Sequence, residues 1–193
     1  MADLPIDPNR VMLTGENPFI RLSETDDGPV LTDASFWRIL FSPVGPGHVL
    51  YIKSELTADA WRIYSDNIAM TRWLQSTIQG SLNEATADAQ LPVIDADFEK
   101  TGDVHSFWTE LVSSHDDEIL LTWYEIGDPL LIHTQPGGER PYGVATVLVP
   151  ALGARLTING VQAKGRAWAR DNNGRPFSTC ALAFAESWTE PRE

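Results

Sequence analysis

Four side chains in the second half of the chain could transfer protons. His105 lies in the run VHSFW and His133 in LLIHTQ, while Glu110 and Glu125 each interrupt an otherwise apolar run. Imidazole titrates near neutrality, and an apolar wall raises the pKa of a carboxyl group held against it, so both suit general acid/base catalysis. A second interpretation stays open for each residue, in which the histidines are structural and the glutamates face solvent.

Another polar group surrounds the junction between a predicted strand and a predicted helix. The segment AWRIYSDNIAMTRWLQ places Arg62, Tyr64 and Arg72 there, beside the free N–H groups of the first helical turn. An arginine binds a carboxylate in a bidentate manner, so we expect this junction to bind an anionic part of a substrate. Alternatively, Ser65 or Asp66 caps the helix and the arginines pair with surface acids.

Aromatic residues next to these groups could form the walls of a binding site. Trp108, Trp123 and Tyr124 provide aromatic surface on both faces of two neighbouring predicted strands. By strand alternation, Glu110 shares a side with Trp108, and Glu125 shares a side with Trp123. The competing interpretation is that these aromatic residues belong to the core, as most strand aromatics do.

The sequence carries no motif of a familiar cofactor or metal site. It lacks a phosphate-binding glycine loop, G-x-S-x-G, H-E-x-x-H, paired C-x-x-C and the EF-hand loop, so no cofactor is expected. Two histidines on the first and third of three successive strands would be roughly 10 Å apart at the backbone. His105 and His133 have that relation, so a shared metal would require their side chains to lean together.

Short strand-like runs separated by turn signals fill the C-terminal half of the chain. They extend from EILLTWYEI to FSTCALAFAESW, and Asn159-Gly160 is a type I′ turn signal between two of them. Ala181 and Ala183 give the last run a face of small side chains. Such a face accommodates either a large neighbouring group or a ligand cavity.

The first half of the chain contains the other predicted elements. FWRILFS at 36–42 and HVLYIKS at 48–54, joined by PVGPG, predict a β-hairpin. Apolar residues at helical spacing predict one internal helix over about 66–84. Residues 1–33 contain four prolines and predict an extended N-terminal leader, which precedes a single β domain over 34–193.

These elements predict an all-β fold with one internal helix. About ten strands without alternating helices favour an antiparallel arrangement, either a closed β-barrel of lipocalin- or calycin-like architecture or a jelly-roll sandwich. We favour the barrel, because short turns between consecutive strands are typical of up-and-down order.

Composition narrows the possible partners. The 193-residue chain has a formal net charge of −13, which argues against nucleic-acid binding and against an anionic membrane surface. Its single cysteine, Cys180, cannot form an internal disulfide, and no apolar run is long enough to span a bilayer. We therefore expect a cytoplasmic protein.

The leading functional hypothesis is a barrel that binds a small, partly apolar organic molecule, with or without a carboxylate. It would act by cofactor-free acid/base chemistry as an isomerase, hydratase, dehydratase or lyase. The alternatives are a non-catalytic carrier or sensor, a metal-dependent enzyme that uses histidines, and an interaction module whose acidic segment 84–128 docks a basic partner. The expected partner is a small-molecule ligand, and a homo-oligomer is left open.

Overall fold

The computed structural model describes residues 7–137, 141–172 and 174–191. Strands hold 55% of the residues and helices 13%, which confirms the predicted all-β class. The strands are β1 (Val11–Glu16), β2 (Phe19–Leu22), β3 (Thr32–Phe41), β4 (Gly47–Lys53), β5 (Arg62–Ser65), β6 (Val93–Asp103), β7 (Phe107–Ser114), β8 (Glu118–Ile126), β9 (Leu130–Thr134), β10 (Gly143–Ile158), β11 (Val161–Gln162), β12 (Ala169–Asn172), β13 (Arg175–Ser178) and β14 (Cys180–Thr189). The helices are α1 (Ile68–Ser76) and α2 (Ile78–Leu82), with 3-10 turns at Pro8–Arg10, Glu55–Thr57 and Glu84–Thr86.

Twelve of the strands form one large, mixed sheet. The order is β1-β14-β2-β3-β4-β5-β6-β7-β8-β10-β11, with β9 attached to β10, while β12 and β13 form a separate hairpin. The prediction of a purely antiparallel meander in sequential order is wrong. β5 and β6 are parallel, and β14 lies between β1 and β2. A parallel pair needs a long crossover, and the segment that contains α1 and α2 supplies it.

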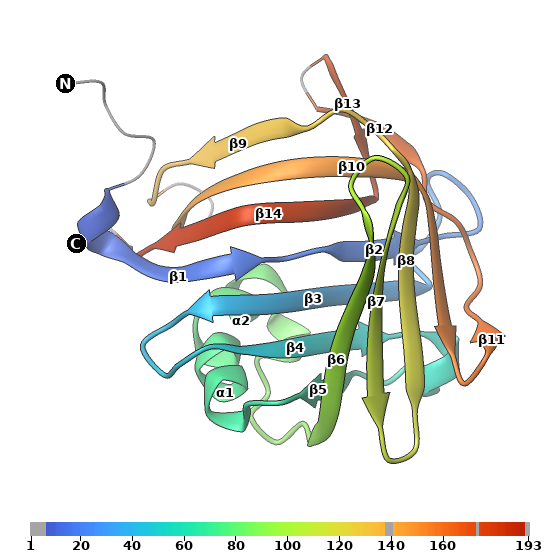
Figure 1. The fold of residues 1–193 in the computed structure, drawn as a ribbon, viewed down its shortest axis with the longest axis horizontal. Coiled ribbons are helices and arrows are strands. Elements are labelled where there is room, and N and C mark those ends of the chain that lie inside the picture. The colour runs from blue at the N-terminus through green and yellow to red at the C-terminus, as the bar shows by residue number, and fades with distance from the viewer. Residues whose placement is uncertain (1–6, 138–140, 173, 192–193) are drawn as a thin grey trace.

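The elements form three layers. Figure 1 shows β6, β7 and β8 crossing the direction of β1, β3 and β4 steeply, with α1 and α2 on the far side of β3 and β4. Alternation along β3 sends Phe36 toward the crossing strands and Trp37 toward the helices, so this sheet is buried on both faces.

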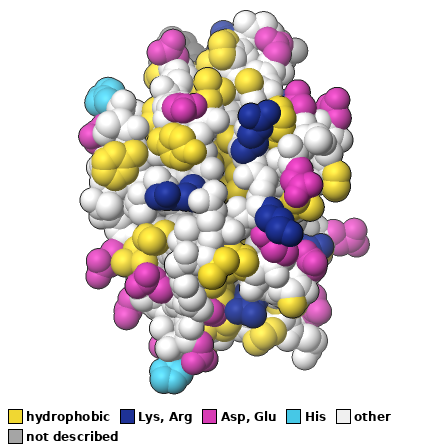
Figure 2. All heavy atoms as spheres, turned by 90° about the vertical axis from the view of Figure 1, so that its right-hand side faces the viewer, with side chains coloured by type: hydrophobic (Ala, Val, Ile, Leu, Met, Phe, Trp, Pro, Cys, Tyr) yellow, Lys and Arg dark blue, Asp and Glu magenta, His cyan; other side chains and the backbone are white. Residues whose placement is uncertain are grey.

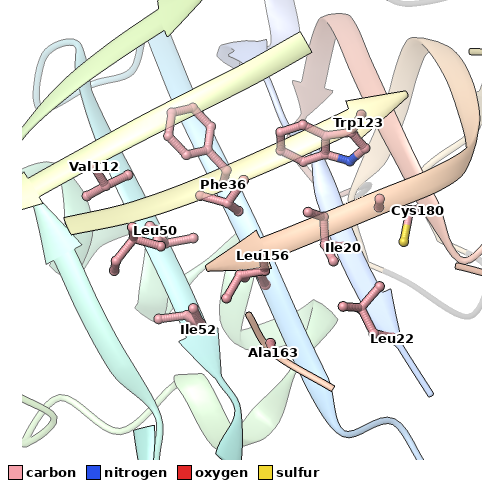
Figure 3. Packing of buried hydrophobic residues seen from close by; sticks show 14 of the residues in the cluster. Ile20, Leu22, Phe36, Leu50, Ile52, Val112, Trp123, Leu156, Ala163 and Cys180 are labelled. Atoms are coloured by element: carbon pink, nitrogen blue, oxygen red, sulfur yellow. The ribbon is translucent and has the colours of Figure 1, made fainter. Parts of the chain in front are cut away.

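The space between the two strand layers is filled by side chains, which we call the inner core. Figure 3 shows its members pointing toward one another from β2, β3, β4, β7, β8 and β10. Phe36, Leu50, Ile52, Tyr64 and Trp123 are among those with no exposed surface. The face that the barrel hypothesis assigned to a ligand is therefore occupied by packed core at these residues.

Local predictions hold best where the partner strand is close in sequence. The hairpin is confirmed, because β3 and β4 pair with Trp37 opposite Val49. The Asn159-Gly160 turn is also confirmed, since both residues have positive φ, of 52° and 77°, and connect β10 to β11.

The predicted single helix is wrong in its extent. Thr77, with φ −123° and ψ −105°, separates α1 from α2. Its hydroxyl donates to the carbonyl of Trp73, one turn back. The N-cap is Asn67, whose side chain accepts the N–H of Met70, and not Ser65 or Asp66.

The sequence GVATVLVPALGARLTI forms one long strand, β10. Residues 143–150 pair with β14, and residues 151–158 pair with β8. Pro150 lies where the partner changes, a position at which its missing N–H disturbs neither ladder greatly.

The segment predicted as a leader contributes two strands, β1 and β2, to the sheet. β1 pairs with both β14 and β3. A Cβ on Gly15 would lie 2.2 Å from the carbonyl oxygen of Arg38, so only glycine permits this approach. The close pairing places Glu16 opposite Arg38.

The surface carries both signs of charge. Figure 2 shows Lys and Arg side chains scattered among acidic and hydrophobic ones on one face, with no single patch of either sign. Within the described ranges, the structure contains no helix of the length and apolarity that a membrane crossing requires.

Candidate functional site

A cavity of about 520 Å³ lies on the sheet face opposite the inner core. Its floor comes from β2, β3, β10 and β14, and its sides come from α2, β9 and β13. Alternation decides which side chains reach it, since Phe19 and Arg21 of β2 line the cavity while Ile20 and Leu22 belong to the inner core. Its volume is typical of small-molecule sites, which measure about 300–1,000 Å³.

Small side chains on β14 leave room for this cavity. Ala181 and Ala183 are buried beside Phe19, Ile132 and Phe177. The small-residue face of β14 therefore accommodates both large neighbouring side chains and part of the cavity, because Ala183 also lines the cavity.

The lining combines aromatic surface with a few polar groups. The aromatic members are Phe19, Trp61, Phe177 and Trp188, and the polar members include Asn17, Arg21, Asp33, Ser35, Gln79, Asn83, Thr146 and Glu186. The wall is therefore mixed, since eight of its seventeen residues are polar or charged. Aromatic surface beside placed polar groups suits a small organic molecule.

Arg21 and Asp33 face each other at one part of the cavity. They are opposite in the β2–β3 register, and Arg21 Nε lies 3.6 Å from Asp33 Oδ1, longer than a hydrogen bond. Burial raises the pKa of the Asp33 carboxyl above its ordinary value of 3.8, and the charge of Arg21 partly opposes this shift. The Arg21 guanidinium also lies over the Phe19 ring, at 4.9 Å from its centroid.

Glu186 is a second carboxylate of the cavity wall. It is 3% exposed, and its Oε1 accepts a 2.6 Å hydrogen bond from Trp188 Nε1. Both residues come from β14 and lie on the same side of that strand.

A second polar cluster borders the inner core, and we call it the inner network. Its members are Glu16 of β1, Arg38 of β3, His48 of β4, Asp66 and Glu110 of β7. Arg38 donates to Glu16 Oε2 at 2.6 Å and to Glu110 Oε2 at 2.7 Å, and Trp108 Nε1 donates to Glu110 Oε1 at 2.8 Å. Glu110 has no exposed surface, and burial raises its pKa while Arg38 lowers it. Both carboxylate oxygens of Glu110 are therefore bonded within the protein.

His48 extends the inner network toward the surface. Asp66 accepts from the backbone N–H of His48 and lies 2.6 Å from its Nδ1, and Arg38 Nε donates to His48 Nε2 at 3.1 Å. The ring stacks on Phe98 with centroids 5.1 Å apart. Since both ring nitrogens are engaged, the arrangement connects β3 to β4.

The histidines expected to act as proton carriers do not converge. His105 lies in the turn after β6 and is exposed, so it precedes the strand predicted to contain it, which begins at Phe107. The carboxylate of Asp103 accepts the N–H groups of His105 and Ser106, which stabilises this turn. His133 is exposed on β9, on the side away from the cavity-lining Ile132.

The two glutamates predicted as partner acids lie in different environments. Glu110 shares a side with Trp108, as alternation predicts, and belongs to the inner network. Glu125 is exposed and has a φ of 53°, so the alternation that placed it beside Trp123 is interrupted at this residue.

The residues predicted to form one anion-binding junction have different partners in the structure. Arg62 and the hydroxyl of Tyr64 both bond Asp117 Oδ2, at 3.1 and 2.6 Å, and burial raises the pKa of Tyr64 to about 12. Arg72 instead donates to Gln75 and to the carbonyl of Leu91.

The predicted aromatic walls are also separated. Trp108 bonds the inner network, whereas Trp123 is fully buried in the inner core and donates to the carbonyl of Phe19. Tyr124 is 41% exposed on the opposite face, where it covers Gly153. These three side chains do not line the cavity described above.

The cavity residues Arg21, Asp33 and Asn17 were not selected from the sequence. A signal was present, because FIRL alternates in the manner of a strand with Arg21 on one side. The four prolines of residues 1–33 predict an extended leader instead, and a leader gives its side chains no predicted neighbours.

The part of the chain that the structure describes contains no group of three or more His, Cys, Asp or Glu side chains able to hold a metal ion. No protein-family model, curated protein or solved structure matches this chain. The geometry of the cavity is therefore the basis for the function proposed below.

Proposed function

We propose that the protein binds a small, partly apolar organic anion in the cavity and catalyses a cofactor-free proton transfer on it. The observation that carries this proposal is the pair of Arg21 and Asp33 in the lining of a 520 Å³ cavity. The pair is partly exposed and not closely bonded, so Arg21 retains capacity to bind a ligand carboxylate. The aromatic walls suit a ring or an apolar chain.

Asp33 is the proposed proton carrier. A general acid or base works best when its pKa lies near the working pH, and burial shifts the pKa of Asp33 in that direction. In its ionised form Asp33 would remove a proton from a carbon beside a carbonyl group of the ligand. It would return the same proton to another atom, so the step is a tautomerisation without net oxidation. An isomerase reaction consists of this step, whereas hydratase and lyase reactions share the proton removal and then continue with loss of a leaving group from the neighbouring carbon.

The same cavity supports a second candidate function, a non-catalytic carrier or sensor. This alternative is favoured by the apolar share of the lining, which suits binding and requires no proton carrier. It predicts thermal stabilisation by ligand without turnover.

We further propose that the sheet closes as a barrel of lipocalin- or calycin-like architecture, with a jelly-roll sandwich as the alternative. Pairing of β10 with both β8 and β14, and of β14 with β2, supports closure. In this arrangement the cavity lies outside the barrel wall. The proposed location is the cytoplasm, because a reducing environment suits Cys180, a free and buried thiol.

Binding is tested with two matched probes, 3-phenylpropionate and its neutral amide, by isothermal titration calorimetry. We expect tighter binding of the carboxylate, and loss of that preference in Arg21→Met. Arg170→Met is the matched control, because Arg170 pairs with Asp26 outside the cavity lining. Equal affinity for both probes in the unaltered protein would contradict the role of Arg21.

Catalysis is tested by deuterium uptake from D₂O into phenylpyruvate, followed by NMR. We expect uptake above the buffer rate, reduced by about 10²-fold or more in Asp33→Asn. Asp26→Asn is the control and should keep the rate. Binding of the probe without accelerated exchange would favour the carrier.

A further inference from the structure

Asn17 carries an unused hydrogen-bond acceptor in the lining of the cavity. The residue lies between β1 and β2, lines the cavity and is only 8% exposed. Its Nδ2 donates to Ser35 Oγ at 3.1 Å and to the carbonyl of Phe36 at 2.9 Å. A carbonyl can only accept, so the bond to Phe36 fixes which end of the amide carries the nitrogen. Within the described ranges, Oδ1 of Asn17 has no hydrogen-bond partner.

The neighbouring side chains hold this orientation. The Ser35 hydroxyl accepts from Asn17 and donates to Gln79 Oε1 at 3.4 Å. Gln79 Oε1 also accepts from Trp37 Nε1 at 2.9 Å, and Gln79 Nε2 donates to Thr86. Each hydrogen bond in this series of side chains has a defined donor. A 180° rotation of the Asn17 amide would therefore break its bonds to Ser35 and Phe36. The unbonded atom of the Asn17 side chain is therefore an acceptor only.

We propose that Asn17 selects ligands that carry a hydroxyl or N–H group. This inference rests on the proposed function of the same cavity. Asn17 and Arg21 are four residues apart, so their backbones are separated by at most about 14 Å. Arg21 would bind the carboxylate at one end of an elongated ligand, and Asn17 would accept a hydrogen bond from a donor at the other end. The substrate class is thus a small aromatic carboxylate with a hydroxyl or amino group remote from the acid.

Three probes that differ at one position test this proposal by calorimetry on the full chain. They are 3-phenylpropionate, its 4-hydroxy derivative and its 4-methoxy derivative. The first has no substituent on the ring, the second has a hydroxyl group that can donate a hydrogen bond, and the third has a methoxy oxygen that can only accept one. An acceptor that remains unpaired in a ligand-filled site is costly, so we expect the hydroxy probe to bind at least about tenfold more tightly than the other two. In Asn17→Leu that preference should disappear, while 3-phenylpropionate still binds.

Two further measurements keep the outcomes distinct. Thr71→Val removes a buried hydroxyl on α1 that lies outside the cavity lining, so it should lower stability and keep the tenfold preference. Equal binding of the three probes to the unaltered protein would overturn the role of Asn17 and leave the cavity as an anion site. Binding of none of them would overturn the proposed function, and this inference with it.

Discussion

Two arginine–carboxylate pairs lie on opposite faces of the same sheet and differ in how completely they are bonded. Arg38 and Glu110 are 2.7 Å apart in the inner network, and Trp108 occupies the second oxygen of Glu110. Arg21 and Asp33 are 3.6 Å apart at the cavity. Burial raises the pKa of both carboxyl groups. A raised carboxyl pKa therefore does not by itself distinguish a binding site from a structural ion pair in this protein. An arginine and a carboxylate that are not closely hydrogen-bonded to each other, beside a cavity, are the distinguishing feature.

The difference has a physical origin in access to solvent. An unpaired charge in a packed interior is so costly that the inner network must satisfy its own groups. It does so by joining β1, β3, β4 and β7 through one guanidinium. At the cavity, water or a ligand can supply the missing partners, so Arg21 and Asp33 need not bond each other closely.

The largest expected effect is on stability. Arg38→Met leaves Glu110 buried without its cationic partner, and we expect a loss of about 3–5 kcal/mol in the free energy of unfolding. Arg21→Met, at the partly exposed pair, should cost under about 1 kcal/mol. Urea unfolding of both variants measures the difference. Similar losses would show that the two pairs are equally structural.

A smaller effect distinguishes the packing of the two faces. Ala34 of β3 is fully buried in the inner core, and Ala183 of β14 borders the cavity. Ala34→Leu should overpack the core and cost about 1–3 kcal/mol. Ala183→Leu has room for the added carbons, so its stability should change by less than about 1 kcal/mol, while 3-phenylpropionate binding weakens. The comparison fails if Ala183→Leu is the more destabilising of the two.

The sequence predicts what depends on near neighbours. Period-2 alternation places Glu110 beside Trp108 on an inward face, and the β3–β4 hairpin follows from two strands joined by a short turn. The turn at His105 also has a local signal, because the dipeptide Gly102-Asp103 is typical of turns, and in the structure Gly102 has a φ of 101° and Asp103 accepts the N–H of His105.

The cavity depends instead on segments that are distant in sequence. β2 pairs with β14, so Phe19 lies opposite Ala181, and β10 supplies the far side of the floor. No local sequence pattern predicts that β14 pairs between β1 and β2. Arg21 and Asp33 belong to the segment predicted as a leader, and only the long-range pairing brings them to a shared cavity.

The smallest expected effect is a pH dependence at Asp33. Its pKa is raised in the folded protein above the ordinary value of 3.8, so the folded state keeps this proton to higher pH than the unfolded chain does. The resulting contribution to stability is fully present below pH 3.8 and is lost as the pH rises through the folded pKa. Asp33→Asn cannot ionise, so its stability relative to the unaltered protein should increase with pH over that window and then stay level. Urea unfolding of both proteins across the window measures the difference, and parallel curves would mean that Asp33 is not held in the environment that the acid/base proposal requires.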